Sequence, residues 1–191
     1  MADAREIISF WIDDVGPKGW YSGGAELDAD IRSRFEPAWN EAMAGDCGLC
    51  ITTPDAALAY CILTDQFPRN MFRGHGKSFA SDGRARAVAK KAISHNWDMR
   101  IPEPQRQFIY MPLEHSENLM DQDRAVRLFL TRMPENGAGL LPHAQAHRSI
   151  IRKFGRFPAR NEALGRSSTD AELAWLEAGG YRSELQALDA A

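Results

Sequence analysis

The chain has 191 residues, of which 44% are hydrophobic and 26% charged, so it is long enough to bury the core of a globular domain. Its net charge of −3 does not favour nucleic acid or an anionic membrane as a partner. No apolar run reaches the length of a membrane span, and residues 1–6 lack the basic-then-apolar order of a signal peptide. We therefore predict a cytoplasmic protein.

Helical periodicity dominates the N-terminal half. Thr53, Pro54 and Asp55 form a sequence typical of a helix start, and Pro68 should end that helix. Pro37 lies inside another helical pattern, where we expect a kink or a break. The spacing of the apolar residues predicts helices over 4–11, 28–44, 53–66 and 81–93.

The C-terminal half has the same period, and Pro112 should kink the first of its helices. No segment of the chain shows the sustained period-two alternation of a strand. We predict one all-α domain over 1–191, with seven to nine helices in antiparallel hairpins and a frayed tail at 183–191. The helices of this half are expected over 103–118, 122–133, 142–154 and 170–178, with a short one after Pro158.

The three cysteines, Cys47, Cys50 and Cys61, are an odd number, which argues against a secreted disulfide framework. Cys47 and Cys50 have the spacing of a redox motif but lack a βαβ pattern around them. A zinc site would need a second pair of ligands. We expect reduced, incidental thiols, with no cofactor and no bound metal.

One phrase occurs twice, each time at the end of an apolar helical run. The first copy is Phe67-Pro68-Arg69-Asn70 and the second is Phe157-Pro158-Ala159-Arg160-Asn161. A glycine follows each copy, and then a Ser/Thr-Asp pair that is typical of a new helix start. The repetition predicts a duplicated helix–corner–helix unit.

The stretch from Tyr110 to Glu117 is the best candidate for chemistry. His115 lies beside carboxylates, a pairing used in general acid–base catalysis, and a proline inside a helix often marks a functional site. The alternative is a polar helix end at which His115 caps a carbonyl group. We name His115 as the catalytic acid or base, oriented by Glu117.

His143 and His147 lie four residues apart and so share one helix face. They form half of a metal site, and Glu114 or Glu117 could supply a third ligand, but the zinc-protease motif is absent. One of the two histidines could instead line a pocket.

Basic residues gather around the two corners. Arg156, Arg160 and Arg166 follow the helix that carries His147, and Arg69 belongs to the matching corner. If the corners face each other, their guanidinium groups converge on a site suited to a carboxylate or a phosphate. Alternatively, each arginine holds a loop by bonding carbonyl groups, and the two asparagines cap helices.

The chain resembles the bacterial family catalogued as domain of unknown function 924. This resemblance covers nearly the whole chain, although the stretch 47–50 departs from the family pattern. It implies an all-α fold similar to the right-handed superhelices of tetratricopeptide repeats, with no established activity. The matching stretches are 10–11, 63–70, 73–74, 78–82, 110–117, 147–164 and 169–176.

These patterns lead to one hypothesis and one alternative. The hypothesis is a pocket between the corners and the 103–118 helix that binds a small anionic metabolite, with His/Glu acid–base chemistry. The alternative is a tetratricopeptide-like scaffold that binds a peptide or a partner helix in a concave groove. Besides His115 and Glu117, the pocket is expected to contain Arg69, Asn70, Tyr110, His147, Arg156, Arg160 and Asn161.

Overall fold

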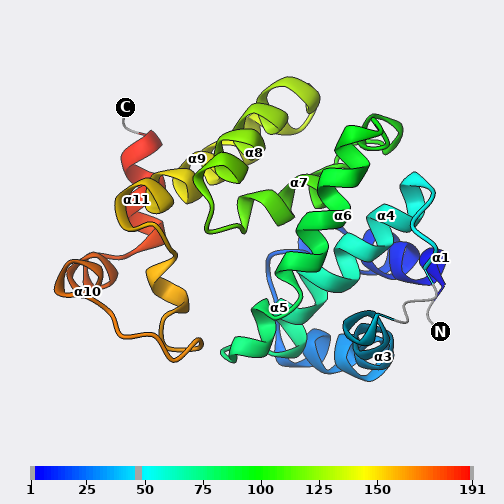
Figure 1. Ribbon diagram of the computed structural model, residues 1–191, viewed down its shortest axis with the longest axis horizontal. Coiled ribbons are helices and arrows are strands. Elements are labelled where there is room, and N and C mark those ends of the chain that lie inside the picture. The colour runs from blue at the N-terminus through cyan, green and yellow to red at the C-terminus, as the bar shows by residue number, and fades with distance from the viewer. Residues whose placement is uncertain (1–2, 46–48, 190–191) are drawn as a thin grey trace. The chain divides into compact units, whose positions relative to one another are not determined.

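The computed structural model describes residues 3–45 and 49–189. Within these residues every regular element is a helix and no strand is present, which confirms the all-α class (Figure 1). Contacts between residues divide the chain into two compact units, Met1–Pro112 and Leu113–Ala191. Each unit is described by itself, and the single domain remains a prediction.

The N-terminal unit combines α-helices with short π-helical and 3-10 segments, labelled η. Its elements are α1 (Ala4–Ile8), η1 (Ser9–Val15), α2 (Gly16–Gly19), α3 (Ala25–Ala44), α4 (Pro54–Cys61), η2 (Ile62–Gln66), α5 (Phe67–Met71), η3 (Gly76–Phe79), α6 (Asp82–Ser94), η4 (Asp98–Arg100) and most of α7 (Gln107–Glu114).

Phe67 lies at the centre of the N-terminal core and is fully buried. Its ring centroid is 4.7 Å from that of Phe35, 5.5 Å from that of Trp11 and 5.9 Å from that of Phe10. These separations are typical of favourable aromatic packing, and they join η1, α3 and α5.

The C-terminal unit is built on a helix hairpin. The second helix of the hairpin, Gly137–Phe154, also packs against the last helix of the chain (Figure 1). It contributes Ile150 and Ile151 to a small buried cluster with Phe157. The elements after α7 are α8 (Leu119–Arg132), α9 (Gly137–Phe154), η5 (Pro158–Arg160), α10 (Asp170–Glu177) and α11 (Tyr181–Asp189).

Two helices differ in extent from the sequence-based expectation. Helix α3 runs through Pro37 without a break. The helix expected over 103–118 is shorter, because α7 ends at Glu114 and the Asn118 side chain caps α8 by accepting from the Met120 and Asp121 N–H groups.

The tail expected to fray is helical as far as Asp189, because Glu184 ties α11 to α9. Glu184 is buried and accepts hydrogen bonds from Ser149 and from Lys153, the latter at 2.7 Å. Residues 190–191 lie outside the described residues, as does Cys47. No helix in the described part of the chain is long and apolar enough to cross a membrane.

Candidate functional site

A buried carboxylate meets a histidine in the C-terminal unit. Glu114 ends α7, and its Oε1 lies 2.9 Å from Nδ1 of His147 on α9. The Glu114 side chain is 6% exposed and that of His147 is 20% exposed. Nδ1 of His147 also lies 2.9 Å from the carbonyl oxygen of His143. Because both neighbours are acceptors, we assign a proton to Nδ1, so this nitrogen donates.

Two further histidines and a tyrosine surround this pair. The His115 ring centroid lies 6.1 Å from that of His147, in an edge-to-face arrangement. The Tyr181 hydroxyl, supplied by α11, lies 2.6 Å from Nδ1 of His143. The Tyr181 ring centroid is 5.1 Å from that of His147. We call these five residues, Glu114, His115, His143, His147 and Tyr181, the histidine cluster.

The surroundings of the cluster favour the ionised form of the Glu114 carboxyl group and the protonated form of the Tyr181 hydroxyl group. Burial raises the pKa of Glu114, but the neighbouring charges of His147, His115 and His143 outweigh it, so the pKa lies below its ordinary value. Burial, together with the charge of Glu114, raises the pKa of Tyr181. The Tyr181 hydroxyl therefore stays protonated and donates to His143.

Glu117, the residue expected to orient His115, binds residues of the second corner. Arg166 donates to both of its oxygens, at 2.8 and 2.9 Å, and the Phe157 N–H donates to Oε1 at 2.8 Å. Burial raises the pKa of Glu117, and these bonds more than reverse that effect. Through these bonds Glu117 holds the second corner, and the orientation of His115 by Glu117 remains a prediction.

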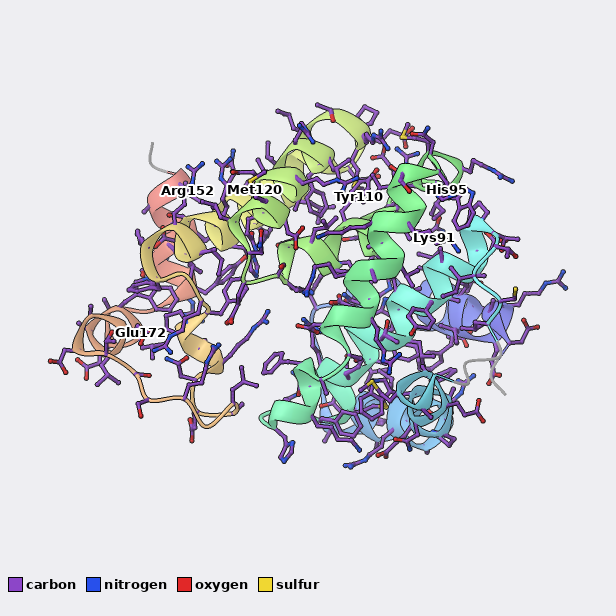
Figure 2. The ribbon with its side chains drawn as sticks, viewed as in Figure 1. Lys91, His95, Tyr110, Met120, Arg152 and Glu172 are labelled. Carbon is purple, nitrogen blue, oxygen red and sulfur yellow. The ribbon has the colours of Figure 1, made fainter. Side chains whose placement is uncertain are left out.

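The other residues of the second corner also bind within their own unit. Arg156 donates to both oxygens of Glu172, at 2.6 and 2.7 Å, and Asn161 donates to Glu172 at 3.3 Å (Glu172 is labelled in Figure 2). Arg156 and the Thr169 N–H lower the pKa of Glu172 to about 2. Arg160 lies over the Phe157 ring, with Cζ 4.3 Å from the centroid. Here Arg156 and Asn161 act as loop clamps.

In the N-terminal unit the first corner is held in a similar way. Arg69 donates to both oxygens of Asp82, at 3.0 and 3.2 Å. Asn70 donates to Asp28 of α3 at 2.8 Å. Tyr110 of α7, labelled in Figure 2, is fully buried and donates to Asp98 at 2.7 Å. These carboxylates join the corner and α7 to other elements of the unit.

The comparisons with known proteins agree with the fold and leave the activity open. Residues 7–180 match the profile of a family described as "Bacterial protein of unknown function (DUF924)". The chain belongs to this family. A solved structure of a protein of unknown function from Agrobacterium tumefaciens is similar, with a TM-score of 0.84 and 36% sequence identity. The similarity covers 91% of this chain and 96% of that one. Comparison with curated proteins finds no match.

The predicted site residues of this DUF924 protein fall into two sets. Arg69, Asn70 and Tyr110 belong to the N-terminal unit, and the other predicted residues belong to the C-terminal unit. The structure brings His115 and His147 together. The single pocket containing all of the predicted residues remains a prediction.

Sequence reasoning missed two members of the histidine cluster as acid–base partners. The sequence places Glu114 beside His115 and as a possible metal ligand but does not pair it with His147, and it does not point to Tyr181. The adjacency of Glu114 to His115 and the four-residue spacing of His143 and His147 were signals for the cluster. No local signal points to Tyr181, because its contact with His143 depends on how α11 packs on α9.

Two further findings concern possible metal ligands and the cysteines. Residues 3–45 and 49–189 contain no group of three or more His, Cys, Asp or Glu side chains placed to hold a metal ion. Cys61 is buried, and this burial raises the pKa of its thiol well above the ordinary value. Cys50 is exposed.

Proposed function

We propose that the histidine cluster is an acid–base site that acts on a small anionic metabolite. The observation that supports the proposal is the buried Glu114–His147 pair, at 2.9 Å. A carboxylate that accepts from Nδ1 of a histidine holds the ring in one orientation and stabilises the imidazolium that forms when Nε2 takes a proton. In this proposal His147 is the base and Glu114 is its positioning residue.

The remaining members of the cluster are suited to act as the acid that returns a proton to the ligand. Tyr181 stays protonated, and its hydroxyl contacts His143 on the same helix face as His147. His115 lies against the edge of His147 and adds a third imidazole. Histidine is the side chain whose ordinary pKa suits proton exchange near neutral pH.

The anionic class of the ligand is supported by Arg160. Its guanidinium group lies over the Phe157 ring, and that ring is in edge contact with His147 at 5.4 Å between centroids. Guanidinium groups suit carboxylates and phosphates because they offer paired donors in one plane. Arg156 and Arg166 contribute less to this ligand, since carboxylates of their own unit already bind them.

A thermal-shift screen of the full chain tests the proposal. The probes are inorganic phosphate, sugar phosphates, and mono- and dicarboxylates, each tested against wild type, His147→Gln and His95→Gln. A ligand at about 100 times its Kd stabilises the native state by about 2.7 kcal/mol, so binding should raise Tm. We expect a hit that His147→Gln loses and His95→Gln keeps.

His95 is a matched control because it is exposed and its ring lies 4.9 Å from that of Trp97 in the N-terminal unit. A hit that persists in His147→Gln would remove the histidine cluster from the binding site. No hit in the whole panel would refute the anionic ligand and favour the alternative, a scaffold that binds a peptide.

A further inference from the structure

A second site lies in the N-terminal unit, distant in sequence from the histidine cluster. A cavity opens on the surface of this unit. Its volume of about 330 Å³ is at the lower end of the range for small-ligand pockets. Its floor is apolar, with Leu58 and Ile101 both nearly fully buried. The lining residues are Arg5, Ile8, Ser9, Asp13, Asp55, Leu58, Ile101, Pro102 and Gln105.

The local backbone explains why polar side chains line one wall of the cavity. Arg5, Ser9 and Asp13 recur at intervals of four residues, so they follow one side of α1 and η1. The η1 segment is π-helical over seven residues, and π-helical turns are rare and frequent at functional sites. The opposite wall carries Asp55, in the first turn of α4.

The charges around this cavity do not neutralise one another. Arg5 is a cation, and Asp13 and Asp55 are anions; all three side chains are exposed. Within residues 3–45 and 49–189, none of the three takes part in an ion pair within 4.0 Å. One opening therefore presents a cation and two carboxylates above an apolar floor.

We propose that this cavity binds a free amino acid with an apolar side chain. Arg5 would bind the carboxylate of the ligand, because guanidinium and carboxylate groups form charge-assisted hydrogen bonds. Asp13 and Asp55 would accept from its ammonium group. Leu58, Ile101 and Pro102 would contact the side chain, which gains free energy by leaving water.

Calorimetric titration of the full chain with L-leucine tests this proposal. The second and third probes are 4-methylpentanoate, which lacks the ammonium group, and isopentylamine, which lacks the carboxylate. We expect leucine to bind at least about ten-fold more tightly than either fragment, since the acid leaves Asp13 and Asp55 without a ligand partner and the amine leaves Arg5 without one.

Three variants locate the binding. Arg5→Gln and Asp13→Asn should each weaken leucine binding by about ten-fold or more. Asp14→Asn is the matched control, because Asp14 is the next residue of η1, is exposed and does not line the cavity. It removes the same charge and should leave the affinity unchanged.

Three results would overturn the proposal. These are the absence of leucine binding, an amine that binds as tightly as leucine, and equal weakening by Asp13→Asn and Asp14→Asn. All three differ from a failure of the histidine cluster, because no residue of that cluster lines this cavity.

Discussion

Replacing Glu114 with glutamine tests whether the buried carboxylate stabilises the C-terminal unit. Glutamine has nearly the same volume and keeps one acceptor oxygen, so the change removes a charge without opening a cavity. A buried charge can be destabilising in itself, because its removal from water is costly. The pKa of Glu114 decides the sign: it lies below the ordinary value, so the neighbouring histidines outweigh the effect of burial and favour the ionised form.

The magnitude follows from the charge that the Glu114–His147 contact loses, because the glutamine oxygen can still accept from Nδ1. The Glu114 carboxylate lies 2.9 Å from Nδ1 of His147, with 6% of the Glu114 side chain exposed. A hydrogen bond to a charged group contributes about 1.5–3 kcal/mol. Because a bond between neutral groups contributes about 0.5–1.5 kcal/mol, we expect Glu114→Gln to lower the free energy of unfolding by about 1 kcal/mol at about pH 6. The measurement is urea unfolding followed by circular dichroism.

The pH dependence gives a second test of the same change. A carboxyl group whose pKa is depressed by folding stabilises the native state above its unfolded pKa, and this contribution is lost as the pH falls through the folded pKa. The difference between wild type and Glu114→Gln should therefore shrink as the pH falls below about 4.5.

The matched control for Glu114 is Glu177→Gln, which changes an exposed glutamate at the end of α10 in the same unit. The stabilising role of the Glu114 charge is refuted if Glu114→Gln is as stable as this control at about pH 6. It is equally refuted if the difference from wild type grows in acid.

Three further predictions concern other parts of the chain. Phe67→Ala should lower the free energy of unfolding by about 3–5 kcal/mol, because the ring is fully buried among aromatic neighbours; a loss below about 1 kcal/mol in urea unfolding would contradict this. The pKa of Glu172 is about 2, so wild type should lose its advantage in Tm over Glu172→Gln as the pH falls from about 4.5 to 2, and a constant difference would argue against the Arg156 contact. Iodoacetamide should alkylate exposed Cys50 in the native protein and Cys61 only after unfolding; native labelling of Cys61, detected by peptide mass spectrometry, would show that its burial is wrong.

Helix starts were predictable because their signals are local. The Thr53 side chain accepts from the Ala56 N–H, and Thr169 forms a capping box with Glu172, as Ser/Thr-type starts suggest. Both bonds span three residues, so tertiary packing is not needed to recognise them. The effect of Pro37 was harder to judge, because buried Phe35 and Trp39 hold α3 in the core on both sides of the proline.

The repeated corner phrase was informative about structure and less so about ligands. Gly74 and Gly165, which follow the two copies, both have positive φ angles, of 78° and 62°. The arginines and asparagines of the phrase were expected to converge on an anion. Within their own units, Arg69 of the first copy binds Asp82 and Asn161 of the second copy binds Glu172.

The sequence by itself determined the all-α class, the positions of most helices, several caps and the shared face of His143 and His147. These properties depend on residues within about four positions of one another, where hydrogen bonding and side-chain spacing are set by the helix itself. Only the tertiary structure decided which carboxylate each cation meets. Charge attraction favours any nearby partner, so the position of Glu114 beside α9 within the C-terminal unit selects it for His147, and the packing of α11 adds Tyr181.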